Sequence, residues 1–267
     1  MSAPSIRAPA VAGLFYPANP AALAANVDSM LAAARTAPLV PKALIVPHAG
    51  YVYSGPVAAS AYALLRPLAG AIRRVVLFGP AHRVPVAELA ASPATAFETP
   101  LGRIAVDTTA IAAAAMLPQV RISDEAHLDE HSLEVQLPFL QSLLDEFTIA
   151  PFVVGGASGR QVAEVMELLW GGSDTLIVVS SDLSHYLPYP MAQQIDGATI
   201  DTVLSLRPLA HHEQACGAAS INGLVEAARR HHLAPRLLDL RNSGDTAGDK
   251  ARVVGYAALA FAENPDG

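Results

Sequence analysis

The sequence predicts a single α/β domain over residues 1–267, with three layers around a mixed, mostly parallel central sheet. Three observations support this prediction. Short apolar runs alternate with longer stretches of helical composition, which is typical of a sheet covered by helices. Hydrophobic residues make up 52% of the 267 residues and charged residues only 15%, which is enough for one large buried core. No linker, internal repeat or low-complexity stretch divides the chain.

An irregular arm and two helices flanking a strand are expected in the first quarter of the chain. The arm spans residues 7–20, and the Ala and Leu content of residues 20–34, which lack helix breakers, favours a helix there. The apolar run at 43–46 then predicts a short buried strand. Pro56 suits the first turn of a helix, so the next helix is predicted at 57–65.

The same alternation continues to the end of the chain. Apolar runs predict further strands at 73–78, 148–154, 175–179, 237–240 and 253–261. Helices are predicted at 108–116, at 192–206 and at 218–231. One further helix is predicted to begin near Ser132, and another to follow Gly156 and end at Trp170. A hairpin at 97–104 with a Pro/Gly turn, together with the closing strands, makes the predicted sheet mixed.

Composition and charge exclude several classes of partner. The formal net charge is -7 and no basic patch stands out, so nucleic acid is not an expected partner. The N-terminal residues lack an apolar signal core and no apolar run reaches the length of a membrane span, so no membrane association is expected. The single cysteine, Cys216, cannot form an internal disulfide, which fits a reducing compartment. These features predict a cytoplasmic protein and leave its oligomeric state open.

Three predicted strands end in the same way, with a histidine in the loop that follows. His48 comes directly after Pro47, His82 follows a Gly-Pro stop, and His185 follows the strand at 175–179 together with Asp182. The carboxyl ends of parallel strands share one edge of a sheet, so these side chains are expected to converge. Histidine and carboxylate side chains are ligands of transition metals. The alternative is that each histidine only caps a strand and hydrogen-bonds a turn.

Two other residues have both a structural and a functional interpretation. His131 lies where a helix is predicted to begin, and either caps that helix, with Glu134 in an arrangement like a capping box, or takes part in a site. Cys216 is by default a small buried hydrophobic residue. However, Gly217 and the start of a helix follow it, which predicts a lowered thiol pKa.

Several segments, in order along the chain, resemble the Memo-like family, which in bacteria and archaea is also called AmmeMemoRadiSam system protein B. The similarity extends from Ala12 to Ala258. The segments that carry it are Pro47-His48-Ala49-Gly50-Tyr51, Gly79-Pro80-Ala81-His82, Asp129-Glu130-His131-Ser132-Leu133-Glu134, Ser180-Ser181-Asp182-Leu183-Ser184-His185 and Ala215-Cys216-Gly217. This resemblance implies a fold similar to the class III extradiol dioxygenases, which are non-haem iron enzymes.

The resemblance also implies roles for individual residues. It places metal ligands at His48, His82 and Cys216, with iron(II) or copper as the metal and zinc as a further option. It places Asp182 and His185 in the same pocket, His185 as the general base, and His131 as a histidine on the substrate side. The dioxygenases complete a triad of two histidines and a carboxylate. A softer thiolate in the third position favours copper or a redox role over ring cleavage.

Three functions are compatible with these residues. The first is a metal-dependent oxidoreductase acting on a small molecule, in which His185, oriented by Asp182, moves protons. The second is a module that binds a metal or an anionic peptide in an enzyme-like pocket without turnover. The third is a cysteine hydrolase or transferase, with Cys216 as the nucleophile and a nearby histidine as the base.

Overall fold

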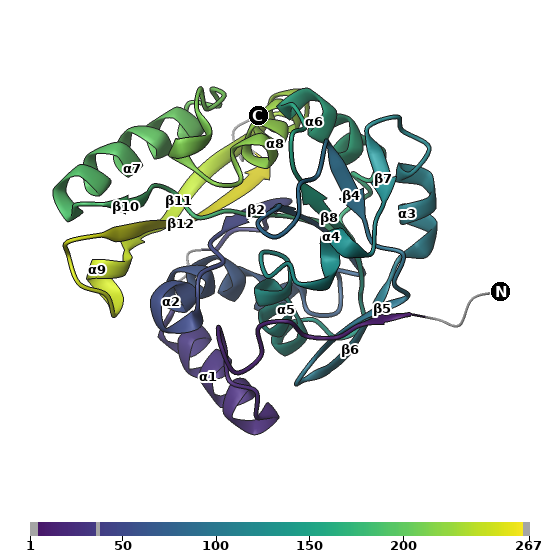
Figure 1. The fold of residues 1–267 in the computed structure, drawn as a ribbon, viewed down its shortest axis with the longest axis horizontal. Coiled ribbons are helices and arrows are strands. Elements are labelled where there is room, and N and C mark those ends of the chain that lie inside the picture. Colours follow the sequence, from purple (N-terminus) through teal and green to yellow (C-terminus); the bar gives the residue numbers. More distant parts are fainter. Residues whose placement is uncertain (1–4, 36–37, 264–267) are drawn as a thin grey trace.

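Five parallel strands form the middle of the sheet in the computed structural model, which describes residues 5–35 and 38–263 (Figure 1). In spatial order they are β6 (Gly102–Val106), β8 (Thr148–Val154), β3 (Arg74–Pro80), β9 (Thr175–Ser180) and β2 (Ala43–Val46). Each neighbouring pair runs in the same direction, as the predicted alternation of strands and helices requires.

Antiparallel pairs occur at the margins of the same sheet, which has twelve strands within the described residues. On one side, β5 (Ala96–Thr99) forms the predicted hairpin with β6, and β1 (Ile6–Arg7) pairs with β5. On the other side, β12 (Val253–Glu263) runs antiparallel to β2 and also pairs with β10 (His185–Leu187) and β11 (Leu233–Asn242). Of two further short strands, β4 (Leu89–Ala91) pairs antiparallel with β8, and β7 (Val120–Ile122) pairs parallel with β4. The prediction of a mixed, mostly parallel sheet is confirmed.

Helices cover both faces of this sheet and complete the three layers (Figure 1). One face carries α1 (Pro20–Ala33), α2 (Tyr51–Tyr62) and α5 (Leu137–Leu143), and the other carries α3 (Thr108–Ala114), α6 (Gly159–Leu168), α7 (Tyr189–Leu204) and α8 (Ala218–Arg230). Short helices lie in the connections: α4 (Glu125–Leu128), α9 (Ser243–Thr246), and the 3-10 turns η1 (Ala63–Leu68), η2 (Glu134–Gln136) and η3 (His212–Gln214). Among the described residues, no helix combines the length and the apolar composition that crossing a membrane requires.

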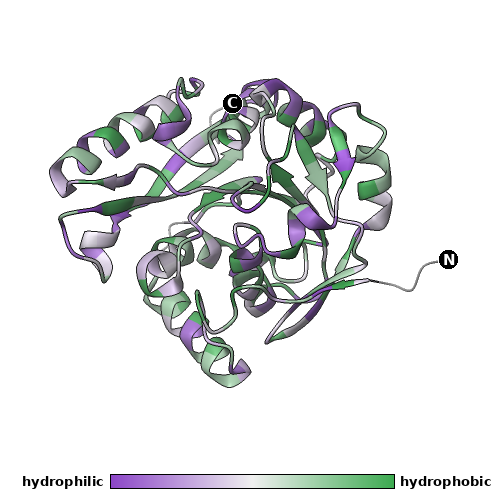
Figure 2. Cartoon of the chain, viewed as in Figure 1, coloured by the Kyte–Doolittle hydropathy of each residue, from purple (hydrophilic) through white to green (hydrophobic). Residues whose placement is uncertain are grey.

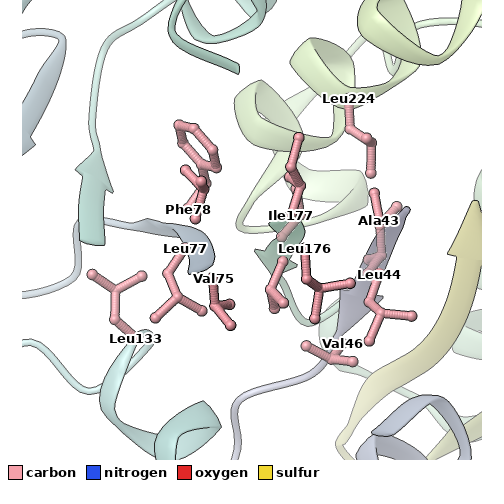
Figure 3. Close-up of a cluster of buried hydrophobic side chains, with 14 of the residues drawn as sticks. Ala43, Leu44, Val46, Val75, Leu77, Phe78, Leu133, Leu176, Ile177 and Leu224 are labelled. Carbon is pink, nitrogen blue, oxygen red and sulfur yellow. The ribbon is translucent and has the colours of Figure 1, made fainter. Parts of the chain in front are cut away.

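The core lies along the central strands, where side chains on both faces of the sheet are buried. Leu44, Leu77 and Ile177 are completely buried, and Figure 3 shows them with Leu224 of α8 among their neighbours. Figure 2 shows the central strands as hydrophobic, with hydrophilic residues on the peripheral helices and loops. Because both faces of these strands are covered, their sequences read as continuous apolar runs rather than as alternating ones.

The predicted start of the second helix is wrong. Helix α2 begins at Tyr51, not at 57, and Pro56 lies inside it. Proline disfavours a helical conformation for the residue before it, through contacts with that residue's Cβ. The preceding residue here is Gly55, which has no Cβ, so the helix continues through the proline.

Two further boundaries differ from the prediction. Strand β11 begins at Leu233 rather than at 237 and includes Pro235, which is tolerated because β11 pairs only with β12 and lies at an edge. The helix expected from Ser132 begins instead as the 3-10 turn η2 and becomes α5 at Leu137. Glu134 does not form a capping box, because its carboxylate binds the N-terminal arm.

Candidate metal centre

Two of the predicted histidines meet at the carboxyl edge of the sheet. The order β3, β9, β2 places the ends of these three parallel strands side by side. His48 lies two residues beyond the end of β2, His82 two beyond β3, and Asp182 two beyond β9. The ring centroids of His48 and His82 are 5.1 Å apart. The predicted convergence therefore holds for His48 and His82, whereas His185 is not in the group of described residues whose nitrogens gather there.

His131 joins the same group, although the sequence placed it on the substrate side. It lies in the loop between α4 and η2, and its ring centroid is 5.6 Å from that of His48 and 4.7 Å from that of His82. Each of the three histidines offers a nitrogen, and these nitrogens all lie within 4.8 Å of one another. We call His48, His82 and His131 the histidine cluster.

Cys216 lies beside the histidine cluster and contacts one member of it. The residue sits between η3 and α8, and its Sγ is 3.4 Å from Nε2 of His48. The backbone N–H of Asp182 donates to the same sulfur at 3.3 Å. The family resemblance implied His48, His82 and Cys216 as ligands, and this geometry brings the thiol next to the first of these imidazoles.

A hydrogen-bond network fixes the ring of His48. Ser180 donates its single hydroxyl proton to the carbonyl of Ser132 at 2.6 Å and accepts from Nε2 of Gln136 at 2.8 Å. The amide of Gln136 is oriented by the Pro47 carbonyl, to which Nε2 also donates. Nδ1 of His48, 2.8 Å from the Ser180 hydroxyl oxygen, must therefore be the donor. This leaves a lone pair on Nε2, the nitrogen that faces Cys216.

Glu130 occupies the equivalent place behind the other two histidines. Its carboxylate accepts hydrogen bonds from Nδ1 of His82 at 3.0 Å and from the backbone N–H of His82 and Ser132. Burial opposes ionisation of Glu130, but these bonds and the charge of His82 hold the pKa of its carboxyl at about 2. Nδ1 of His131 is buried without a hydrogen-bond partner, 3.4 Å from the same carboxylate.

His185 is not oriented by Asp182, contrary to the prediction. Nδ1 of His185 donates to the carbonyl of Leu183 at 2.8 Å, which leaves Nε2 as the basic nitrogen. The Asp182 carboxylate instead accepts the backbone N–H of His48 at 2.8 Å and lies 4.0 Å from Nε2 of that histidine. The ring of His185 is thus held by the backbone carbonyl two residues before it.

Burial controls the protonation of these side chains. It lowers the pKa of His48, aided by repulsion from His82 and His131 in their protonated forms, and it lowers the pKa of His131 to about 4. It also raises the pKa of Asp182 to about 7, although the backbone N–H of His48 partly offsets this. At neutral pH, His48 and His131 are therefore neutral imidazoles, the form that binds metal.

The predicted lowering of the Cys216 pKa is wrong. Burial and the nearby charge of Asp182 raise the pKa of the thiol to about 12. The backbone N–H groups around the sulfur, including that of Asp182, act in the opposite direction but do not compensate. Proximity to the start of a helix does not lower the pKa of a thiol that is removed from water.

Three residues of this region were missed from the sequence: Glu130, Gln136 and Ser180. Ser180 is the last residue of β9 and lies two residues before Asp182, so its position at the carboxyl edge of the sheet could have identified it. Glu130 and Gln136 gave no such signal, because their partners are 48 and 89 residues away in the chain.

The donor set fits a first-row transition ion. Buried neutral imidazoles and a neighbouring thiol suit iron, copper and zinc, whereas magnesium and calcium prefer oxygen ligands. The orphaned Nδ1 of His131 also fits, because an ion on Nε2 favours a proton on Nδ1, where Glu130 can accept it.

Comparison with known proteins gives one consistent result. The profile of the family described as Memo-like protein matches residues 7–260. A MEMO1 family protein of Archaeoglobus fulgidus is 36% identical over 269 residues, covering 96% of this chain and 99% of the relative. The MEMO1 family proteins of Ignicoccus hospitalis and Aeropyrum pernix are 37% and 38% identical, covering 96% and 95% of this chain and 98% and 99% of their own lengths.

Proposed function

The chain belongs to the Memo-like family, and we propose that it is a metal-dependent oxidoreductase that binds iron(II) or copper and acts on a small molecule. The observation that supports this most directly is the buried histidine cluster, whose three nitrogens lie within 4.8 Å of one another. The 3.4 Å approach of the Cys216 sulfur to His48 adds a soft ligand that zinc also accepts but that copper and iron use in redox sites.

In the proposed site, His48 and His82 bind the metal and Cys216 supplies the third ligand. His131 is close enough to take that third place or to complete a set of four. The bound ion would supply Lewis acidity and one-electron chemistry at the edge of the sheet. A Cys216 ligand would have to lose its proton on binding, and that proton would have to leave the site, because Nε2 of His48, 3.4 Å away, is needed for the metal.

His185 is the proposed general base. Its Nδ1–H bond to the Leu183 carbonyl leaves the Nε2 lone pair available, and burial lowers the pKa of the ring, so it is neutral at pH 7. Asp182, whose pKa burial raises to about 7, is a second group that can gain or lose a proton near neutral pH.

Elemental analysis of protein purified without chelators and without oxygen tests the proposal. Wild type should contain close to one equivalent of iron or copper, and the variants His48→Ala and His82→Ala should contain almost none. His212→Ala is the matched control, because the His212 side chain is 87% exposed and pairs with Glu213 rather than with a residue of the histidine cluster. Full metal content in both cluster variants would place the site elsewhere.

The third ligand is identified by the same measurement on two further variants. If Cys216 is a ligand, Cys216→Ser should weaken copper binding more than zinc binding, because a hydroxyl is a poorer ligand for soft metals. If His131 is the third ligand instead, His131→Ala should lose the metal while Cys216→Ser keeps it.

A further inference from the structure

We propose that Glu130 is a positioning residue, whose carboxylate holds His82 and His131 so that Nε2 of each ring faces the metal site. This inference rests on the proposed metal site and concerns the residues behind it. Glu130 does not contact the site itself, since its two oxygens are occupied by groups on the far side of the rings.

The geometry around Glu130 is that of an acceptor surrounded by donors. The residue is 2% exposed. One oxygen, Oε1, accepts from Nδ1 of His82 at 3.0 Å and from the backbone N–H of Ser132 at 2.9 Å. The other, Oε2, accepts from the backbone N–H of His82 at 2.6 Å. Nδ1 of His131 lies 3.4 Å from Oε1 and has no other partner.

These contacts determine which nitrogen of His82 carries the proton. Both oxygens of Glu130 face backbone N–H groups, which can only donate, so these groups favour the ionised form of the carboxyl. An ionised carboxylate only accepts, and Nδ1 of His82 must therefore be protonated. In the neutral ring, the remaining nitrogen, Nε2, then keeps its lone pair for a metal.

Glutamine cannot replace this carboxylate without a conflict. If its oxygen faced the backbone N–H of His82, its NH₂ group would face both the N–H of Ser132 and Nδ1 of His82. His82 would then have to move its proton to Nε2, the nitrogen needed by the metal. If the amide were turned round, its NH₂ group would oppose the N–H of His82 at 2.6 Å. Either arrangement disturbs the ring.

Glu130 also differs from the groups behind the other histidines. His48 is held by a neutral hydroxyl, that of Ser180, and His185 by a backbone carbonyl. Glu130 alone places a full negative charge behind an imidazole of the histidine cluster. A carboxylate in this position raises the basicity of the ring, and its loss typically costs about 10- to 100-fold in metal affinity.

Glu134 provides a matched control four residues further on. It is also fully buried, and its carboxylate binds only groups of the N-terminal arm: the Arg7 guanidinium, the Tyr16 hydroxyl and the backbone N–H groups of Ala10 and Val11. None of these is a histidine. A substitution at Glu134 therefore perturbs the same segment of chain without touching a ring.

The first test uses the unaltered protein. Two-bond ¹H–¹⁵N correlation spectra of histidine-labelled protein, treated with a chelator, report the tautomer of each ring. His82 is expected as the Nδ1–H form, and assignment follows from the signal lost in His82→Ala. A signal from the Nε2–H form would overturn the proposal, without any variant of Glu130 having to fold.

The second test compares Glu130→Gln with Glu134→Gln. The affinity for zinc and cobalt(II), measured by competition with a chromophoric chelator, should fall about 10- to 100-fold in Glu130→Gln and at most a few-fold in Glu134→Gln. The cobalt(II) absorption spectrum should change only in Glu130→Gln. Equal losses in both variants, or none in Glu130→Gln, would refute the positioning role alone. Failure of wild type to bind either ion would refute the proposed function and this role with it.

Discussion

The reactivity of Cys216 distinguishes a metal ligand from a catalytic nucleophile. Burial and the charge of Asp182 raise the pKa of its thiol from the ordinary value of 9.0 to about 12. Alkylating reagents react with the thiolate. At a pH below both the ordinary and the raised pKa, each increase of one unit in the pKa lowers the thiolate fraction tenfold. In protein treated with a chelator, the thiolate fraction at pH 7.5 should therefore be about a thousandfold below that of a free thiol.

Alkylation by iodoacetamide, followed by mass spectrometry of the intact chain, measures this directly. Cys216 is the single cysteine of the sequence, so every adduct reports on this residue, and Cys216→Ser gives the background. The rate should still rise about tenfold per pH unit at pH 10, whereas the rate of N-acetylcysteine levels off near its own pKa. Denatured protein serves as the control for complete labelling.

The shape of the pH profile decides the outcome, because burial also slows access of the reagent and so lowers the absolute rate at every pH. A rate that levels off below pH 8 would refute the reasoning and show an activated thiolate. The 3.4 Å contact between Cys216 and His48 would then be a nucleophile and its base, and a cysteine hydrolase would replace the oxidoreductase.

Three other variants test separate parts of the structure. His185→Ala should keep the metal content of wild type while any turnover is lost, and loss of the metal would make His185 a ligand. Asp196→Asn removes a carboxyl whose pKa burial raises to about 6, and whose ionisation costs the fold about 3 kcal/mol as pH rises from 4 to above 6. Urea unfolding of Asp196→Asn should therefore show higher stability than wild type at pH 7.5 and a flatter profile between pH 4 and 6; an unchanged profile would contradict this. Arg7→Ala leaves the charge of Glu134 buried without its partner and should lower the free energy of unfolding by about 3–5 kcal/mol. A loss below about 1 kcal/mol would show that the Glu134 carboxylate does not depend on Arg7 for its stabilisation.

The central strands could be predicted because nearly all of their residues are buried, so each strand appears in the sequence as a continuous apolar run. The observed bounds of β8 equal the predicted ones. Strand β9 is one residue longer than predicted, and β3 starts one residue later and ends two residues later. The polar residues that follow such runs, His48 and His82, could therefore be placed at one edge of the sheet without knowing any contact. The start of α2 could not be predicted, because the effect of Pro56 depends on the residue before it.

The parts of the site that escaped prediction depend on contacts between distant segments. The pKa of Cys216 follows from burial of its sulfur against Asp182, which is 34 residues away, rather than from the glycine beside it. Similarly, the roles of Glu130 and Gln136 follow from which histidine or serine each one meets. A sequence identifies residue types that could bind a metal, but the groups that orient them are identified only once the loops are placed.

The segment from Glu130 to Glu134 couples the N-terminal arm to the histidine cluster. Arg7 donates to the backbone carbonyl of Glu130 and pairs with the carboxylate of Glu134, while the Phe15 ring packs against His131 with centroids 4.8 Å apart. The arm therefore holds both ends of the segment that presents two groups of the proposed site. The arm contacts Glu134 and the backbone carbonyl of Glu130, but not the Glu130 carboxylate that holds His82. A substitution in the arm should therefore lower the stability of the fold far more than the affinity for the metal.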